Sequence, residues 1–586
     1  MNVLGLSAFF HESACCLLRD GRLVAAAEEE RFSRVKHDPR LPVAAFRWCL
    51  RRGGIGITDL DCVAYYESPV KKLSRQLWAG VPAGAADLGW LDPGAPERAI
   101  REGLGYEGPI LTFDHHLSHA ASAFFFSGFP EAAVLTVDGV GEWATTTYSR
   151  ASGAAIEPFE QVEFPHSLGL LYSTLTSYLG FEVNDGEYKV MGLAPYGEPR
   201  YVEEMWKLVS TRRDGQYRLD LQYFDFIRGK RMYSEALPRL FGEPPRQREA
   251  EITRFHQDVA RSLQAVLEEI LLEKVGWLHE RTHLPDLCMA GGVALNVVAN
   301  GRILREGPFE RLFVQPAAGD SGGCLGAAAL AWIARTGQRP ETGPLRHVYL
   351  GPAWSADEAA GLLAAAGIAA LDFRGRETDL LEAVVDRLGQ GQVVGWFHGP
   401  LELGPRALGA RSLLADPRDP GMRDRLNRLV KKREAFRPFA PSVLAAHAAE
   451  HFDLGHPSPF MLETCRVVSP LDLPAVTHVD GSARPQTVDP ADAPRFAALL
   501  EAFRRRTGCP VLVNTSFNVR GEPIVCSPVD ALFCMGVSGI DGLVLEDFLI
   551  DRERIPANWT DLLPAWRERA RSGFGRKVSE DLYTFV

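Results

Sequence analysis

Val3-Leu-Gly-Leu-Ser7 and Ala133-Val-Leu-Thr-Val-Asp138 are two short apolar runs, and each is typical of a buried β-strand. The same pattern follows both runs: a small polar loop, a second strand, a glycine turn and a third strand. The loops are Ala8–Glu12 and Gly139–Glu142, and the turns are Asp20-Gly21 and Ser152-Gly153. This repeat, offset by 131 residues, predicts a duplicated α/β domain whose two lobes face a ligand cleft. Two unrelated three-stranded meanders are the alternative.

The stretches after the repeats predict helices and a second domain. Residues 116–126, 167–179 and 255–278 carry apolar residues at helical spacing. Residues 335–346 are polar and rich in Gly and Pro, as is typical of a linker, and an α/β pattern resumes near Val348. We therefore expect two domains, residues 1–345 and 346–586.

Composition and charge exclude several classes of protein. The chain has 586 residues, 46% hydrophobic and 24% charged, which is the mix of a globular protein and excludes a disordered or fibrous chain. The net charge is -11 and no basic run exceeds three residues, as in Lys431-Lys432-Arg433, so we expect no binding of long nucleic acid. Because there is no signal peptide, no apolar run of about 18 residues and no CxxC pair, we expect a cytoplasmic, soluble protein with buried free thiols and no membrane contact. An oligomer stays open.

A pair of histidines predicts a metal site. His115 and His119 are four residues apart and therefore share one face of a helix, where two imidazoles can bind one metal ion. Asp138 and Asp320 each end a predicted strand beside a glycine turn and are the candidate carboxylate ligands. An ordinary helix start with polar histidines is the alternative.

Two further glycine-rich turns predict contact with a nucleotide. They are Gly291-Gly292-Val-Ala-Leu-Asn296 and Gly319–Gly323, with Gly139 and Gly141 as a third turn on the facing lobe. Glycine lets backbone amides approach a phosphate, and a following helix N-terminus favours anions. Neither turn is a P-loop, and close packing of helix on strand explains such glycines as well.

Cationic residues gather among Gly, Pro and Phe in the C-terminal part, which favours a site for a phosphorylated ligand. The motifs are Gly404-Pro405-Arg406-Ala-Leu-Gly409, Lys431-Lys432, Arg437-Pro438-Phe439, Arg484-Pro485-Gln486 and Asn514-Thr515-Ser516. Solvated arginines in an Arg-rich chain are the alternative. Near the N-terminus, His11 and Lys36 are candidates for acid–base chemistry or for orienting an acceptor, with a polar loop and a charged helix end as the alternative.

In this order the motifs resemble a known family over nearly the whole chain. His115-xxx-His119, Val137-Asp138-Gly139, Glu187-Tyr-Lys189-Val-Met-Gly-Leu-Ala-Pro195, the Gly291 turn and Gly319-Asp320 are similar to the universal threonylcarbamoyl-adenosine metalloprotein, which has an actin/sugar-kinase-like (ASKHA) fold. The C-terminal motifs narrow the resemblance to the nodulation/tobramycin-type O-carbamoyltransferases. The implied fold is α/β: a duplicated ASKHA domain followed by a YrdC-like α/β domain.

The resemblance implies a reaction in two stages. The C-terminal domain would make carbamoyl adenylate from carbamoyl phosphate and ATP with Mg²⁺, and the N-terminal domain would transfer the carbamoyl group to a hydroxyl of a small-molecule acceptor. The implied metal, Fe²⁺ in the family, would be bound by His115, His119, Asp138 and Asp320. The implied nucleotide contacts are Gly139, Gly169, Lys189, Gly291, Gly292 and Asn296, and the implied catalytic residues are His11, Lys36 and Arg406. Carbamoyl phosphate and ATP would be held by Arg406, Lys431, Arg437, Arg484, Asn514 and Ser516.

Two alternatives remain at this stage, a tRNA threonylcarbamoyl transferase and a non-enzymatic actin-like nucleotide-binding module. The acidic net charge disfavours the first, and a second set of site motifs in the same chain disfavours the second. Residues 68–110 and 198–250 match no motif, and we expect acceptor specificity there.

Overall fold

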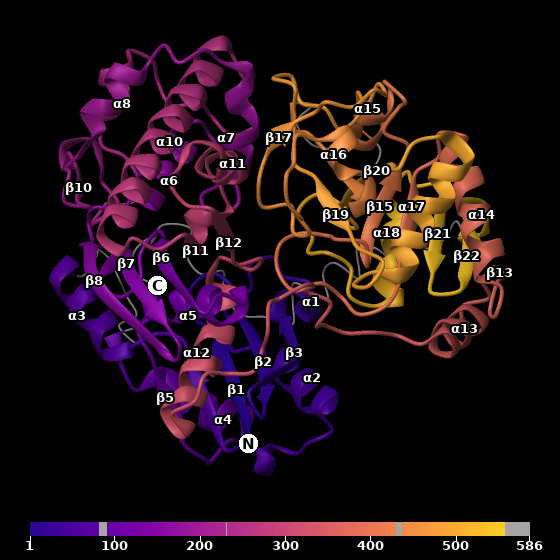
Figure 1. Ribbon diagram of the computed structural model, residues 1–586, viewed down its shortest axis with the longest axis horizontal. Coiled ribbons are helices and arrows are strands. Elements are labelled where there is room, and N and C mark those ends of the chain that lie inside the picture. The colour runs from indigo at the N-terminus through magenta and orange to yellow at the C-terminus, as the bar shows by residue number, and fades with distance from the viewer. Residues whose placement is uncertain (81–90, 230, 429–435, 557–586) are drawn as a thin grey trace. The chain divides into compact units, whose positions relative to one another are not determined.

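The computed structural model describes residues 1–80, 91–229, 231–428 and 436–556 (Figure 1). By backbone contacts the chain divides into two units. Among the described residues, unit 1 contains Met1–Glu29 and His37–Leu345, and unit 2 contains Glu30–Lys36 and residues 346–556. The short segment Glu30–Lys36 belongs to unit 2 although the residues on both sides of it belong to unit 1, and we call it the exchanged segment. The sequence did not predict this assignment. The limits 1–345 and 346–586 stay a prediction about independently folding domains.

Unit 1 is built on two five-stranded sheets of identical topology. In order across the first sheet, the strands are β3 (Arg22–Glu28), β2 (Ala14–Arg19), β1 (Asn2–Ser7), β4 (Cys62–Tyr65) and β5 (Ile110–Thr112). In order across the second, they are β8 (Ala155–Glu163), β7 (Ala144–Ser152), β6 (Glu131–Val137), β11 (Asp286–Ala290) and β12 (Arg311–Val314).

Each sheet pairs its first three strands antiparallel and its last two parallel to the first strand. The fourth and fifth strands repeat as well as the hairpins, and two unrelated meanders would not produce this. The prediction of a duplicated α/β architecture is therefore confirmed.

Two helices pack between these sheets. α5 (His115–Ser127) lies on β6 and β11, α12 (Asp320–Thr336) lies on β1, β2 and β4, and the two helices pack on each other. A Cβ on Gly326 of α12 would clash with the carbonyl of Ser118 in α5, and a Cβ on Gly5 of β1 would clash with the carbonyl of Cys324 in α12. Glycine at both positions therefore brings the backbones into direct contact.

The other helices of unit 1 cover the outer faces. They are α2 (Val43–Gly53), α3 (Pro69–Ala79), α4 (Ala95–Leu104), α6 (Leu168–Tyr178), α7 (Glu187–Leu193), α8 (Val202–Leu208), α9 (Ala236–Phe241), α10 (Arg254–Thr282) and α11 (Val297–Glu306), beside the small ribbon β9 (Val209–Thr211) and β10 (Tyr217–Leu219). Long α10 packs on α6, α7, α8 and α11 (Figure 1). The helices predicted at 116–126, 167–179 and 255–278 are confirmed as α5, α6 and α10. Ser167 caps α6 by accepting a hydrogen bond from Leu170 N.

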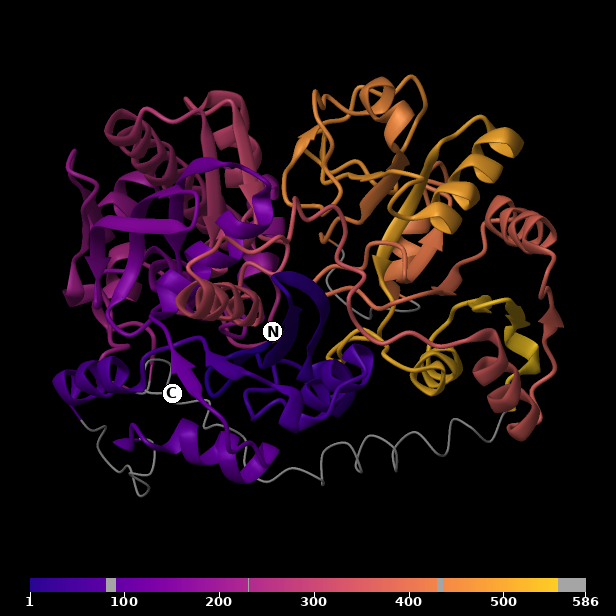
Figure 2. The ribbon, with the colours of Figure 1, turned by 60° about the horizontal axis from the view of Figure 1, so that its bottom comes forward.

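Unit 2 holds one mixed sheet of eight strands (Figure 2). In order across the sheet, they are β13 (Leu371–Asp372), β22 (Phe548–Asp551), β21 (Gly542–Leu545), β14 (Val394–Phe397), β15 (Arg411–Ala415), β20 (Val511–Ser516), β16 (Ala440–Leu444) and β19 (Gln486–Val488). Its helices are α13 (Ala356–Ala365), α14 (Glu377–Gly389), α15 (Met422–Leu426), α16 (Ala448–His451), α17 (Pro494–Thr507) and α18 (Pro528–Val537), beside the ribbon β17 (Cys465–Arg466) and β18 (Ser482–Ala483).

The exchanged segment Glu30–Lys36, which includes most of α1 (Glu29–Ser33), is anchored in unit 2. Arg31 donates to Gly404 O, and Arg34 donates to Ile524 O and Pro523 O. Three guanidinium hydrogen bonds to backbone carbonyls tie this segment to the loops of unit 2.

All ten cysteines are buried thiols without disulfides, as predicted. No helix in the described ranges is both long and apolar enough to cross a lipid bilayer.

The close approach of α5 and α12 gives a stability prediction. Gly326→Ala should lower the free energy of unfolding of unit 1 by about 1–3 kcal/mol, because the new methyl group has to push the two helices apart. Thermal unfolding of the full chain measures this loss.

The matched control is Gly276→Ala in α10, where a Cβ meets nothing within 4 Å. A helix-interior alanine there should stabilise by roughly 0.5–1 kcal/mol. Equal effects of the two substitutions would contradict the packing argument.

Candidate active site

The first turns of α5 present two imidazoles on one face. His115 is the first residue of α5 and His119 follows one turn later, and the side chains of both are 1% exposed. Their Nε2 atoms lie 3.0 Å apart. At this distance one nitrogen can donate a hydrogen bond to the other, or both can direct lone pairs at a cation between them.

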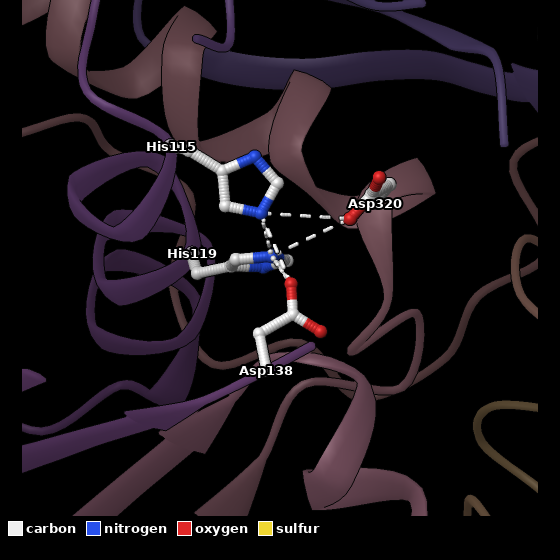
Figure 3. Close-up of side chains that lie close together, drawn as sticks. All are labelled: His115, His119, Asp138 and Asp320. Atoms are coloured by element: carbon white, nitrogen blue, oxygen red, sulfur yellow. Dashed lines mark hydrogen bonds and ion pairs between the residues drawn. The ribbon is translucent and has the colours of Figure 1, made fainter. Parts of the chain in front are cut away.

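Two carboxylates complete the group from the other half of the fold (Figure 3). Asp138 directly follows β6, and its Oδ2 lies 3.0 Å from His115 Nε2 and 3.3 Å from His119 Nε2. Asp320 begins α12, and its Oδ1 lies 3.6 and 3.7 Å from the same two nitrogens. The structure therefore brings all four predicted metal ligands together in one buried quartet.

These four residues fit a divalent metal ion. Nitrogen and oxygen ligands at about 2.0–2.2 Å from a cation lie roughly 3–3.6 Å from one another, which is the spacing seen here. Two imidazoles and two carboxylates suit iron, zinc or manganese, and the anionic carboxylates balance the charge of the ion. The quartet can hold such an ion, and its identity as Fe²⁺ stays a prediction.

Backbone groups and one further carboxylate fix the quartet. Gly292 N donates to Asp138 Oδ1 at 2.9 Å, so the predicted glycine turn orients a metal ligand. Glu142, which is 4% exposed, accepts hydrogen bonds from His115 N at the start of α5 and from Ser68 N just before α3. Glu142 is a positioning residue that the sequence analysis missed, although it ends the Gly139–Glu142 loop.

His116 and His119, both on α5, have pKa values shifted in opposite directions. Burial lowers the pKa of His116 well below its usual value, and its Nδ1 bonds to Thr136 Oγ1 at 2.7 Å, so this residue is a neutral core histidine. Burial alone would also lower the pKa of His119, but hydrogen bonds and charge from Asp138 and Asp320 outweigh it and raise the pKa to about 9. Without a metal ion, the quartet therefore holds a proton at neutral pH.

The glycines predicted to face a nucleotide divide into two groups. A Cβ on Gly139 would meet nothing within 4 Å, so this turn leaves room for a ligand. A Cβ on Gly169 would clash with the backbone of Asp138 and Gly139, and Gly291 has φ 91° against the backbone of Val137. Close packing is thus sufficient to explain Gly169 and Gly291, and their contact with a nucleotide stays a prediction.

The amide of Asn296 is already engaged. Its Oδ1 accepts from Ala299 N at the start of α11 and from Gln264 Nε2, and its Nδ2 donates to Gln264 Oε1. Lys189, on α7, is half-buried with its ammonium 5.9 Å from the centre of the Phe181 ring. The predicted nucleotide contacts of both residues remain untested.

His11 and Lys36 belong to different units. His11 lies in the loop between β1 and β2 of unit 1, stacked on His37 with ring centres 4.4 Å apart. Lys36 ends the exchanged segment of unit 2. Both residues lie near the first repeat in the sequence, which did not predict that they belong to different units.

A buried amide network marks the second site, in unit 2. Asn514 on β20 is 1% exposed and donates to Ser442 Oγ and Gln486 Oε1, both at 3.0 Å. Gln486 on β19 donates in turn to Leu408 O at 2.7 Å. Ser442 and Gln486 thus connect Asn514 to the Gly404–Gly409 motif, and neither was predicted as a site residue.

A buried carboxylate shapes the Gly404–Gly409 loop. Glu402, 2% exposed, accepts hydrogen bonds from the backbone N–H groups of Leu408, Ala410 and Arg411. Arg411 is buried over the Phe397 ring at 3.6 Å, and burial lowers its pKa. These contacts hold the loop that carries Arg406 in one conformation.

The other predicted residues of this site lie on neighbouring elements. Ser516 ends β20 and bonds to Asn518, Arg437 precedes β16, and Arg484 lies between β18 and β19. β15, β20, β16 and β19 are consecutive in the sheet, and β20 runs antiparallel to β15 and β16 while β19 runs parallel to β16. The loops before β15, β16 and β19 and the end of β20 therefore lie at the same end of these strands. Lys431 lies outside the described residues.

The quartet gives a first prediction at this site. His119→Gln should remove the tightly bound metal, because it deletes one of two nitrogen ligands in a buried site. Elemental analysis of desalted protein measures metal per chain. His116→Gln, a neighbouring buried histidine on the same helix, should retain it; loss of metal from both variants would contradict the ligand assignment.

The raised pKa of His119 gives a second prediction. Metal ions have to displace the proton that the empty quartet holds, so the apparent affinity should rise with pH until about 9. The expected slope is about tenfold per pH unit for each proton displaced. Competition with a chelator of known affinity measures this, and an affinity that is level between pH 6 and 8 would rule it out.

Comparison with known proteins agrees with this geometry. The family model described as carbamoyltransferase N-terminus matches residues 2–80 and 103–329, and the one described as carbamoyltransferase C-terminus matches residues 385–552. Nodulation protein NolNO of Sinorhizobium fredii is 40% identical over 95% of this chain and 81% of its own length. An uncharacterized protein of Synechocystis, sll1178, is 43% identical over 97% of this chain and 99% of its own.

Solved structures align more weakly. A ROK hexokinase from Thermus thermophilus covers 57% of this chain and 100% of its own at 16% identity, with a TM-score of 0.27. HypF from T. kodakarensis covers 57% of this chain and 48% of its own at 14% identity, with a TM-score of 0.31. The family models span both units and include the quartet and the amide network, and the chain belongs to the carbamoyltransferase family.

Proposed function

We propose that this carbamoyltransferase makes carbamoyl adenylate from carbamoyl phosphate and ATP and then carbamoylates a hydroxyl of a small natural-product acceptor. One observation carries the proposal: each unit has its own buried, chemically distinct site. Unit 1 has the metal-ligand quartet and unit 2 has an amide network bordered by arginine loops. The duplicated sheets support an ASKHA-type assignment for unit 1, and the mixed sheet is compatible with a YrdC-like unit 2.

In the first stage, the C-terminal residues handle two polyanions. Water hydrolyses carbamoyl phosphate to carbamate and inorganic phosphate, and an oxygen of the carbamate then attacks the α-phosphorus of ATP and displaces pyrophosphate. Arg406, Lys431, Arg437 and Arg484 supply positive charge to the phosphates, with Mg²⁺ bound by ATP itself. Asn514 and Ser516 offer neutral donors and acceptors that suit the carbamoyl amide.

In the second stage, the acceptor hydroxyl attacks the carbamoyl carbon, and the bond to AMP breaks. His115, His119, Asp138 and Asp320 would hold the divalent metal, which supplies Lewis-acid polarisation when bound. The open turn at Gly139 leaves room for the adenylate. We assign His11 and Lys36 to orienting the transferred group and the acceptor.

The adenylate step can be tested separately from the transfer step. Arg437→Ala should reduce pyrophosphate release that depends on ATP and carbamoyl phosphate by about 100-fold or more, because a phosphate loses its fixed cation. Metal content should stay unchanged. Arg505→Ala, an exposed α17 arginine paired with Glu382, is the matched control and should keep full activity.

His119→Gln supplies the complementary result. This variant should still release pyrophosphate and form carbamoyl adenylate, detected by mass spectrometry, but should fail to carbamoylate any acceptor in a hydroxylated panel. Full pyrophosphate release by Arg437→Ala, or none by the wild type, would refute the proposed first stage. Formation of threonylcarbamoyl-modified tRNA from tRNA, threonine and bicarbonate would favour the alternative transferase.

A further inference from the structure

The exchanged segment supports the loop that carries Arg406 at two places. Arg31 donates a hydrogen bond of 2.7 Å to Gly404 O, although the two residues are 373 positions apart in the chain. Phe32 packs against an apolar cluster that includes Ala407. Residues 404 and 407 lie on either side of Arg406, so the N-terminal part of the chain supports the loop before and after this arginine.

The contact made by Arg31 is of a strong kind. Its side chain is 3% exposed, and its charge is paired with Glu30 at 2.5 Å. A hydrogen bond from a buried guanidinium is stronger than one between neutral groups, and removing one partner leaves the other unsatisfied. Gly404 has φ 99°, a conformation that favours glycine, so its carbonyl is presented by a backbone that other residues rarely adopt. Arg31 thus fixes the loop two residues before Arg406.

A second anchor holds the same loop after Arg406. The carboxylate of Glu402 accepts hydrogen bonds from the N–H groups of Leu408 and Ala410, at 2.8 Å each. The stretch that contains Arg406 therefore lies between an anchor at Gly404 O and one at Leu408 N. One of these two anchors comes from unit 2's own sheet region and the other comes from the exchanged segment.

The apolar contact of Phe32 connects this loop to a second one. The cluster against which it packs consists of four buried side chains: Leu401, Ala407, Ile524 and Cys526. Arg34 reinforces the connection, because it donates to Ile524 O at 2.6 Å. The exchanged segment thus holds the loop of Arg406 against the chain that follows Ser516.

We propose that Arg31 and Phe32 are positioning residues for Arg406, so that the phosphate site of unit 2 is completed by the N-terminal part of the chain. They act through the backbone of the loop rather than by touching a substrate. This role rests on the proposed function, in which Arg406 binds phosphate. A displacement of about 1 Å in a group that positions a substrate can cost about 100-fold in rate, so the support of the loop matters as much as its charge.

Kinetics distinguish this role from a purely structural one. A substitution that only destabilises unit 2 reduces the fraction of folded chains, which lowers kcat per chain and leaves KM unchanged. A substitution that displaces Arg406 weakens phosphate binding in the folded enzyme and raises KM.

The test is steady-state release of pyrophosphate by the full-length chain, with ATP and carbamoyl phosphate varied in turn. Arg31→Gln should raise the KM of at least one of these substrates by about 10-fold. Arg387→Gln is the matched control, since Arg387 is a half-buried arginine of α14 that donates to Ala383 O and to Asp551. This variant should keep both wild-type KM values, even where it lowers the Tm.

Phe32→Ala supplies a second, independent variant. It removes the packing on the cluster but leaves the guanidinium of Arg31 in place, and it should raise the same KM by a smaller factor. It decides the outcome if Arg31→Gln does not fold. Wild-type KM values in the folded variants, or an equal rise of KM in Arg387→Gln, overturn the proposal. A wild type that releases no pyrophosphate refutes the proposed first stage itself, and this role with it.

Discussion

The site in unit 1 depends on the direct contact between α5 and α12. Gly326 lies against the carbonyl of Ser118, and Gly5 lies against that of Cys324, so no side chain separates β1, α12 and α5. Because α5 begins at His115 and α12 begins at Asp320, bringing these helices together also brings their N-terminal ligands together. The close packing of α12 on α5 therefore also fixes the geometry of the quartet.

Much of this was readable from the sequence, because the signals were local. Four-residue spacing placed His115 and His119 on one helical face, and an aspartate directly after an apolar strand marked Asp138. Repetition of the hairpin pattern predicted the duplication, since each half encodes the same topology independently. Asp320 was predicted by the same logic to end a strand, and this was wrong, because β12 ends at Val314 and Asp320 begins α12; its membership of the quartet was nevertheless predicted.

Other features could not be read, because they depend on contacts between distant segments. His37 and Asp185 are 148 residues apart, so their contact could not be predicted from the sequence. Gln486 was quoted within a motif, but its link to Leu408 arises only when β19 lies beside β16 in the sheet. The exchange of Glu30–Lys36 into unit 2 likewise depends on carbonyls more than 370 residues further along the chain.

The two units have opposite electrostatic character, and under the proposed function this acidic protein would bind a cation in unit 1 and polyanions in unit 2. In unit 1, carboxylates are buried around imidazoles, so the empty quartet recruits positive charge and retains a proton until a metal replaces it. In unit 2, the buried amide network is neutral, with Asn514, Ser442 and Gln486 hydrogen-bonded to one another, and the buried carboxylate Glu402 is held by backbone N–H groups. The arginines lie on half-exposed loops, where their desolvation cost is small; under the proposed function they would supply affinity for phosphate, while the amide network would supply geometry.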